Sequence, residues 1–417
     1  MRSLVRDFTN QSPEDLGTMK KFALVLSGGG FKGAFQIGAL RYLRQNWSKV
    51  NPGSSEMKFD VIAGVSVGSL NGVLTACNEF AALEKLWFDI GPNVENIYTS
   101  DFIDTKNQSD QLKVRLDFAN IKEKFIPNID LRISLWKGLG LLLSKSKRDK
   151  FIDELLGKVQ KDFSANFQNF RAIADNSPLR QRLNELIRRD KIRDCIFKCG
   201  FVSLNDGRYY SFSHNAFKSD EDFRNGILAS TAMPIVWQPV EKISVEFEGR
   251  EQTISQSVDG GIRNVSPLAD VIEEINNDAP ESDYTIIIIN CSSGEVDYEE
   301  FEKANIAGIA LRSLNDIAIT EIFNNDITEF LRINDIIEQV RAVDPDIVIH
   351  NYKLGEGRID KILRPFKAII IQTDPGILGD SLVANVPLNN RRVEHGEKKA
   401  AEALELLQGG RKDVVVV

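Results

Sequence analysis

A serine between two glycines is the first feature of this sequence that could do chemistry. In residues 60–74, DVIAGVSVGSLNGVL, an apolar run ends at Gly64-Val65-Ser66-Val67-Gly68 and a helix-like segment follows. Glycines two residues before and two residues after a serine allow a sharp strand-to-helix turn that exposes the hydroxyl above a sheet. The pattern predicts a nucleophile at Ser66 on an elbow formed by Gly64 and Gly68. The alternative is a glycine turn with an ordinary serine at a helix N-terminus.

A second glycine-rich turn, LSGGGFKGAF at residues 26–35, could hold a negative charge. It follows the apolar run Phe22 to Leu26, and a helical pattern starts near Gly33. Backbone N–H groups at such a strand-to-helix turn suit either a phosphate or the oxyanion of an acyl-transfer intermediate. Because Gly28, Gly30 and Gly33 fit the pattern G-x-G-x-x-G, a dinucleotide site is one interpretation.

The dinucleotide interpretation needs an acidic residue at the end of the second strand, about 20 residues beyond the loop, to bind the ribose. Glu56 and Asp60 lie before that strand or at its start. The strand ends instead at the Ser66 elbow, which a cofactor domain does not need. The sequence therefore favours the oxyanion, and measured dinucleotide binding would restore the other interpretation.

A serine hydroxyl is a weak nucleophile unless a base takes its proton. In the segment SQSVDGGIRNVSP, Asp259 ends a strand-like run and precedes Gly260 and Gly261. This turn would present the carboxylate at the edge of a sheet, where ligands bind in α/β folds. An aspartate with the ordinary pKa of about 3.9 is charged at pH 7 and can accept a proton. Asp259 is therefore the candidate base, and the alternative is that it only shapes an Asp-Gly turn.

The histidines of the chain, His214, His350 and His395, are weaker candidates for the base. None of them lies beside a glycine turn. His350 and His395 do have the chain order of a hydrolase triad. We nevertheless interpret all three as packing or surface residues.

Strand-like and helix-like segments alternate, which predicts an α/β fold with a mainly parallel central sheet flanked by helices. Several strand candidates are nearly continuous apolar runs, as expected of strands buried on both faces. The strand candidates are residues 21–27, 58–65, 196–204, 284–290 and 367–373. A terminal helix over residues 393–407 should end at Gly409, and another helical region, about residues 298–343, lies between the last two strands.

We expect a leader over residues 1–20, one domain over residues 21–410 and a tail over residues 411–417. Between about residues 93 and 194 strand signals vanish, which predicts a helical insertion or lid. Within it, residues 131–150 combine leucines and a tryptophan with lysines and arginines, which suits an anionic bilayer surface. The alternative is a helix packed on the sheet. The tail has no predicted role in the core, so it is interpreted as a frayed end or as a contact for a partner.

Composition and charge exclude several classes of function. The 417 residues carry a net charge of -8 and the pI is near 5.3, which argues against nucleic acid as a partner. The first residues lack the apolar run of a secretory signal, and no segment has the roughly 18 to 20 consecutive apolar residues that span a bilayer, so we expect a cytoplasmic protein. Metal-binding spacing is absent among the cysteines, so we expect reduced structural thiols and no metal at Cys77, Cys195, Cys199 and Cys291.

The three glycine-rich corners, taken in chain order, resemble those of the patatin-like phospholipases. They are Gly28-Gly29-Gly30-Phe31-Lys32-Gly33, Gly64-Val65-Ser66-Val67-Gly68 and Asp259-Gly260-Gly261. The segment LASTAMPIVWQPV, residues 228–240, is similar to the family's Ala-Ser-x-x-x-Pro block, and the terminal helix also resembles the family. The resemblance covers about residues 20–92 and 195–300, together with the last strand and helix.

This resemblance implies a lipid acyl hydrolase with a Ser-Asp dyad. Ser66 would attack a lipid ester carbonyl and Asp259 would act as general base. The N–H groups of Gly28 to Phe31, in the loop that ends at Gly33, would hold the oxyanion. Lys32 stands where the family usually carries arginine or lysine, consistent with orienting the loop. Water would release the fatty acid from an acyl-enzyme on Ser66, without a metal or organic cofactor.

The partner that the resemblance implies is membrane phospholipid, reached by peripheral association of a cytoplasmic enzyme. Because an unregulated phospholipase would attack the membrane of its own host, we expect a gate on activity. Bacterial patatin-like enzymes include immune effectors switched on by cyclic oligonucleotides, so a cyclic nucleotide activator is one expectation. A soluble carboxylesterase or acyl transferase of the same fold is the alternative. From a different class, the alternative is a lipid-binding or scaffold protein without turnover.

Overall fold

The computed structural model describes residues 20–103, 161, 170–278, 282–302, 304–353, 357–409 and 414–417. The expected leader lies outside these ranges except for Lys20, and so does most of the expected insertion, including all of residues 131–150. The roles expected for these segments, and the division of the chain into a leader, one domain and a tail, therefore stay predictions.

A nine-stranded sheet forms the centre of the described chain. In spatial order its strands are β11 (Val414–Val416), β10 (Lys367–Gln372), β7 (Asp283–Asn290), β1 (Lys20–Leu26), β2 (Val61–Val65), β3 (Ile196–Ser203), β6 (Arg250–Asp259) and β5 (Val240–Phe247), with β4 (Tyr209–Ser213) also paired to β3. Strands β11 to β3 pair in parallel, whereas β4, β5 and β6 pair antiparallel to their neighbours. The carboxyl ends of the parallel strands therefore share one edge.

All five strands predicted from the sequence are present, as β1, β2, β3, β7 and β10. Every residue of β2 and nearly every residue of β7 is buried, because helices cover both faces of the sheet. The prediction of a mainly parallel α/β sheet flanked by helices is therefore confirmed. The sequence did not predict the antiparallel strands β4, β5 and β6.

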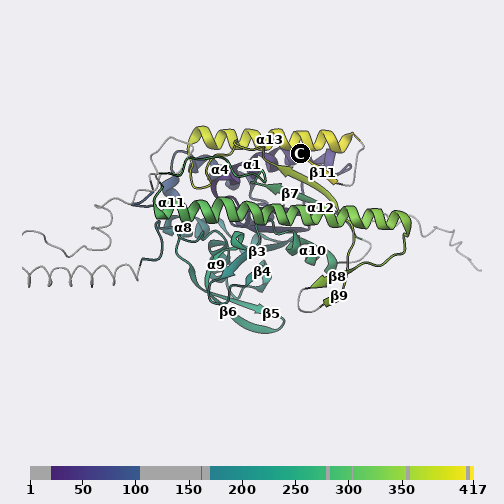
Figure 1. The fold of residues 1–417 in the computed structure, drawn as a ribbon, viewed down its shortest axis with the longest axis horizontal. Coiled ribbons are helices and arrows are strands. Elements are labelled where there is room, and N and C mark those ends of the chain that lie inside the picture. The colour runs from purple at the N-terminus through teal and green to yellow at the C-terminus, as the bar shows by residue number, and fades with distance from the viewer. Residues whose placement is uncertain are drawn as a thin grey trace, which may run out of the picture.

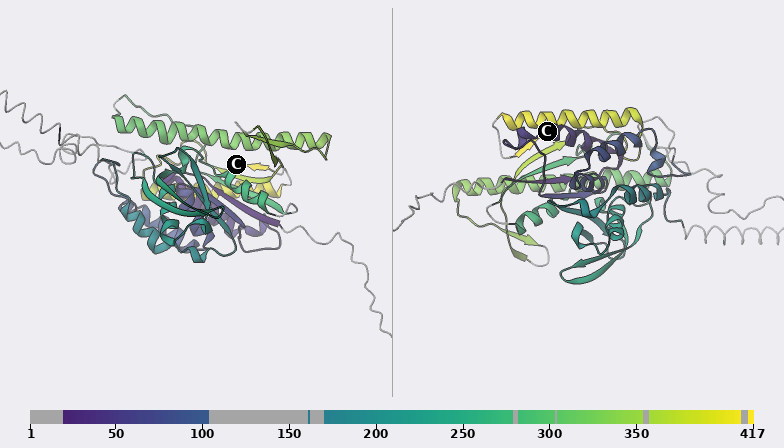
Figure 2. Two further views of the ribbon diagram at one scale, coloured as in Figure 1. Left: turned by 90° about the horizontal axis from the view of Figure 1, so that it is seen from below. Right: turned by 180° about the vertical axis from the view of Figure 1, so that it is seen from behind.

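Two helical layers enclose the sheet (Figures 1 and 2). One apolar core lies against α1 (Ala34–Gln45), α2 (Trp47–Val50), α3 (Val67–Ala76), α4 (Phe80–Ile90), α8 (Ser177–Leu186), α9 (Asp220–Ser230) and α13 (Val386–Gln408). The core on the opposite face lies against α10 (Leu268–Asn277) and α12 (Ile319–Val343). Within the described ranges, no helix combines the length and hydropathy that crossing a bilayer requires.

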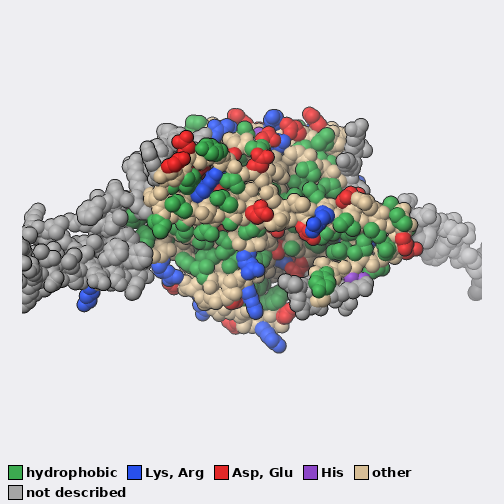
Figure 3. Space-filling view, viewed as in Figure 1, with side chains coloured by type: hydrophobic (Ala, Val, Ile, Leu, Met, Phe, Trp, Pro, Cys, Tyr) green, Lys and Arg blue, Asp and Glu red, His purple; other side chains and the backbone are tan. Residues whose placement is uncertain are grey.

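The helical region expected between the last two strands consists of α11 (Ile306–Leu311), a π-helical turn (Arg312–Ala318) and α12. Figure 1 shows α12 running across the front of the sheet, and Figure 3 shows hydrophobic side chains along the outer face of this region. Its exposed apolar residues include Ile306, Ile309, Leu314, Ile317 and Ile336. The helix thus covers one core and also presents apolar side chains outward.

Two segments have places in the fold that were not predicted. A hairpin of β8 (His350–Lys353) and β9 (Gly357–Ile362) follows α12, and among the described residues it forms a sheet separate from the main one. Residues 414–416 of the expected tail form β11, which pairs in parallel with β10 and buries Val415. A frayed end is therefore the wrong interpretation for these three residues, because the valines complete the edge of the sheet.

The terminal helix α13 begins at Val386, earlier than expected, and is capped at its end by Gly409 as predicted. It packs on α1 at a distance that only glycine allows. A Cβ on Gly38 would lie 1.9 Å from the Val393 carbonyl oxygen, and a Cβ on Gly396 would lie 2.0 Å from the Phe35 carbonyl oxygen. The two backbones therefore meet directly.

We expect Gly396→Ala to lower the free energy of unfolding by about 1–3 kcal/mol or more, because the added methyl forces α13 away from α1. Urea unfolding followed by circular dichroism measures this change. Gly308→Ala is the matched control, since a Cβ at this helical glycine finds its nearest neighbour at 3.7 Å. An equal effect of the two substitutions would contradict the close contact between the helices.

Candidate active site

Ser66 occupies a strained turn between β2 and α3. Its φ angle of 56° lies in the left-handed region, which is unusual for a residue with a side chain. The flanking glycines permit this turn: a Cβ on Gly64 would lie 2.2 Å from the Gly68 carbonyl oxygen, and a Cβ on Gly68 would lie 2.1 Å from the Leu26 carbonyl oxygen. The strand, turn and helix thus have the arrangement that the sequence predicts around Ser66.

Ser230, at the end of α9, stabilises this turn through hydrogen bonds. The Ser66 N–H donates to the Ser230 hydroxyl over 2.9 Å, and the Ser230 hydroxyl donates to the Gly200 carbonyl over 2.6 Å. The hydroxyl oxygens of Ser69 and Ser230 lie 2.7 Å apart. Because the Ser66 N–H is already engaged, it is not available to a ligand.

Asp259 ends β6 and is almost completely buried. Its N–H donates to the Ala232 carbonyl over 2.9 Å, and its Oδ1 accepts the Gly261 N–H over 2.8 Å. Burial raises the pKa of Asp259 to about 7, while hydrogen bonds from the Ser66 side chain and the Gly261 N–H act in the opposite direction. The structure therefore brings Ser66 and Asp259 together and places the titration of Asp259 near neutrality.

The segment 228–240 supports both members of this pair. Ser230 holds the backbone of Ser66, and the Ala232 carbonyl holds the backbone of Asp259. The family resemblance included this segment, but we predicted no role for Ser230 from the sequence. A serine beside a helix end gives no signal of a partner 164 positions away.

The glycine loop after β1 packs against Ser66, since a Cβ on Gly28 would lie 3.2 Å from the Ser66 Cβ. Several of its N–H groups are already engaged. Gly28 donates to the Val265 carbonyl over 3.0 Å, Phe31 to the Ser381 carbonyl over 2.7 Å and Lys32 to the Gly29 carbonyl over 3.1 Å.

In the part of the chain that the structure describes, the N–H groups of Gly29 and Gly30 have no acceptor. Both positions also exclude a side chain. A Cβ on Gly29 would lie 2.5 Å from the Cys291 Cβ, and a Cβ on Gly30, where φ is 54°, would lie 2.3 Å from the Ser381 carbonyl oxygen. The family resemblance implied oxyanion donors from Gly28 to Phe31; the N–H groups of Gly28 and Phe31 are engaged, which leaves those of Gly29 and Gly30 as the candidate donors.

The cavity next to Ser66 is small and apolar. Its volume is about 40 Å³. Its walls include Gly30, Phe31, Val67, Leu70, Trp87, Ile90, Ile97, Leu179, Thr231, Trp237 and Ser381. The lining suits a hydrocarbon chain.

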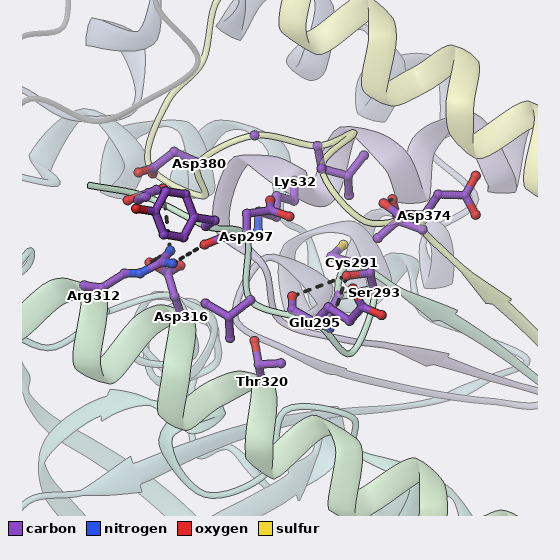
Figure 4. A pocket seen from close by; sticks show the side chains of 18 residues that line it. Lys32, Cys291, Ser293, Glu295, Asp297, Arg312, Asp316, Thr320, Asp374 and Asp380 are labelled. Carbon is purple, nitrogen blue, oxygen red and sulfur yellow. Dashed lines mark hydrogen bonds and ion pairs between the residues drawn. The ribbon is translucent and has the colours of Figure 1, made fainter. Parts of the chain in front are cut away.

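The Lys32 side chain lines a different cavity, of about 290 Å³, beyond the carboxyl ends of β7 and β10. Figure 4 shows this polar pocket, with Lys32 from the glycine loop, Arg312 and Asp316 from the π-helical turn, and Asp374 and Asp380 from the loop after β10. Arg312 pairs with Asp316 over 3.2 Å. Lys32 therefore does not line the cavity of Ser66.

In the described chain, none of the three histidines lines the cavity of Ser66. His214 Nδ1 accepts the Phe197 N–H over 3.3 Å, and burial lowers its pKa. His395 Nε2 accepts the Asp374 N–H over 3.1 Å, and burial lowers its pKa too. His350 lies in the β8–β9 hairpin. These nitrogens have structural partners or lie elsewhere, so Asp259 remains the candidate base beside Ser66.

The chain also has similarities to known proteins. The family model for patatin-like phospholipases matches residues 24–272, more than half of the chain. No curated protein matches the chain. Among solved structures, VipD from Legionella pneumophila is similar, with 16% sequence identity, 97% of this chain and 71% of that chain covered, and a TM-score of 0.35.

We expect the rate of ester cleavage to depend on pH through Asp259. A base must be deprotonated to accept a proton, and burial raises the pKa of Asp259 to about 7. kcat/KM for a monomeric ester should therefore rise about tenfold per pH unit below pH 7 and level off above it. A profile that stays flat from about pH 5 to pH 9 would contradict this role for Asp259.

Proposed function

The chain belongs to the patatin-like phospholipase family, a family of lipid acyl hydrolases, and we propose that it is a phospholipase A with a Ser66–Asp259 dyad. The observation that carries the proposal is the strained Ser66 turn, whose side chain hydrogen-bonds the buried Asp259 carboxyl and lines an apolar cavity together with Gly30 of the glycine loop. A nucleophile, a base and two N–H donors are the groups that acyl transfer needs.

In the proposed first half-reaction, Ser66 Oγ attacks the ester carbonyl carbon while its proton passes to Asp259. The N–H groups of Gly29 and Gly30 stabilise the negative charge on the carbonyl oxygen. Asp259 then returns the proton to the departing alcohol, which leaves an acyl chain esterified to Ser66. A pKa near 7 suits both steps, because the group accepts and donates a proton at similar cost.

In the second half-reaction, Asp259 takes a proton from water, and the resulting hydroxide attacks the acyl-enzyme. The same two N–H groups stabilise the second oxyanion. Proton return to Ser66 Oγ releases a free fatty acid and restores the enzyme. The whole cycle uses only side chains and backbone of this chain.

The proposed substrate is a phospholipid in a membrane. Leu70, Trp87 and Trp237 give the cavity an apolar surface for an acyl chain. The cavity measures about 40 Å³, so the proposal includes a wider, open form that admits the acyl chain. We propose that an activator favours the open form, and a cyclic oligonucleotide is the activator to test first.

We expect Ser66→Ala to lower phospholipid hydrolysis about 10³-fold or more, since it removes the nucleophile. Asp259→Asn should lower it about 10³- to 10⁴-fold, because the amide cannot take the proton. Mass spectrometry of lipids incubated with each protein measures the fatty acid and the lysophospholipid. Ser55→Ala, at an exposed position, is the control. Full activity of both dyad variants would overturn the proposed function.

Further measurements distinguish a phospholipase from a soluble esterase and from a protein without turnover. Faster turnover on phospholipid vesicles than on monomeric esters supports a phospholipase, and the reverse supports a soluble esterase. Both substrates are assayed with and without cyclic nucleotides, and activity already maximal without them contradicts activation. Failure of Ser66 to react with a fluorophosphonate probe would favour a protein without turnover.

A further inference from the structure

The oxyanion loop is connected to a buried arginine near the other end of the chain. Arg392, on α13, is fully buried. We propose that Arg392 is a positioning residue, which holds the glycine loop so that the N–H group of Gly30 faces the carbonyl oxygen under attack. This inference rests on the proposed function of Ser66 and adds a residue outside the matched segment 24–272.

The Arg392 guanidinium donates mainly to backbone carbonyls. Nε donates to Leu378 over 2.7 Å, and Nη2 donates to Asp380 over 2.7 Å. Nη1 donates to the Val383 carbonyl over 2.9 Å and to the Asn389 side chain over 3.2 Å. A planar group with five N–H donors can hold several carbonyls at once, which a lysine cannot reproduce. Arg392 therefore fixes the loop of residues 378–383.

The same guanidinium reaches the glycine loop directly. Its Nη1 donates to the Phe31 carbonyl over 3.2 Å, while the Phe31 N–H donates to the Ser381 carbonyl over 2.7 Å. Ser381 lies between Asp380 and Val383, two of the residues whose carbonyls Arg392 binds. Phe31 is thus held at both its N–H and its carbonyl by one connected unit.

These contacts orient one peptide group of the proposed oxyanion hole. The Lys32 N–H binds the Gly29 carbonyl over 3.1 Å, so the N–H of the same peptide group, that of Gly30, points the opposite way. Because Lys32 follows Phe31 directly, displacement of Phe31 would also turn the Gly29–Gly30 peptide group. Oxyanion stabilisation depends on donors placed in advance, so such a turn should slow the chemical step.

If Arg392 had only a structural role, its substitution would lower the stability of the fold but would not selectively weaken binding of the transition state. The neighbouring Arg391 separates these roles, because its Nε donates to the Ile377 carbonyl over 2.9 Å at a more exposed position of the same helix. Arg391→Lys therefore perturbs α13 and the same loop without removing the contact to Phe31.

The test compares Arg392→Lys with Arg391→Lys in the full chain on a monomeric ester. We expect Arg392→Lys to lower kcat about 10- to 100-fold, less than or comparable to loss of one oxyanion donor, with KM changed less than about threefold. Binding of a trifluoromethyl ketone, which forms a tetrahedral adduct, should weaken in proportion to kcat. Binding of a planar amide analogue should not change. Arg391→Lys should leave all four quantities near wild-type values.

Circular dichroism and thermal unfolding give the concentration of folded protein for each variant. If Arg392→Lys does not fold, Asn389→Ala replaces it. This variant removes one acceptor of Arg392 Nη1 and keeps the guanidinium. It should lower kcat and weaken ketone binding in the same proportion, but by a smaller factor. Wild-type kcat in the folded variant, or equal weakening of ketone and amide binding, would overturn the role of Arg392. Wild-type activity of Ser66→Ala would instead overturn the proposed function.

Discussion

The candidate site depends on a contact between two backbones. At Gly68, the first turn of α3 packs onto the carbonyls of Leu26 and Ser27 at the end of β1, where even a methyl group would lie 2.1 Å from an oxygen. This contact joins the turn that carries Ser66 to the loop that carries Gly29 and Gly30. The left-handed conformation of Ser66 costs about 1–3 kcal/mol, and the hydrogen bond to Ser230 helps to offset that cost. Without this contact, the nucleophile and the loop would not share a cavity.

In the proposed dyad, a buried aspartate takes the place of the histidine of a conventional triad. An exposed carboxylate is a poor proton acceptor at neutral pH, because its pKa lies several units lower. Removal of Asp259 from water raises its pKa to about 7, near that of an ordinary histidine. The hydrogen bonds from Ser66 and Gly261 limit this rise. The sequence indicated the aspartate, but it could not indicate the shift, since that depends on atoms from β3, α9 and the segment 228–240.

Local patterns predicted the parts of the fold that local physics determines. Strands β1, β2, β7 and β10 are recognisable because burial on both faces demands apolar runs, and the Ser66 turn is recognisable because its glycines are adjacent in sequence. Arg392 was not recognisable, since an arginine on an amphipathic helix usually faces solvent. Its partners are carbonyls of a loop whose position only the folded chain defines. The valines of β11 were equally ambiguous, because three residues are too few for a periodic signal.

The contact between Phe31 and Arg392 joins positions 361 residues apart. On the ribosome, the glycine loop is synthesised before α13. If Arg392 sets the conformation of that loop, a nascent chain that already contains both Ser66 and Asp259 still lacks the residue that positions the proposed oxyanion hole. Under the proposed function, the full rate of hydrolysis would then arise only after α13 has docked on α1.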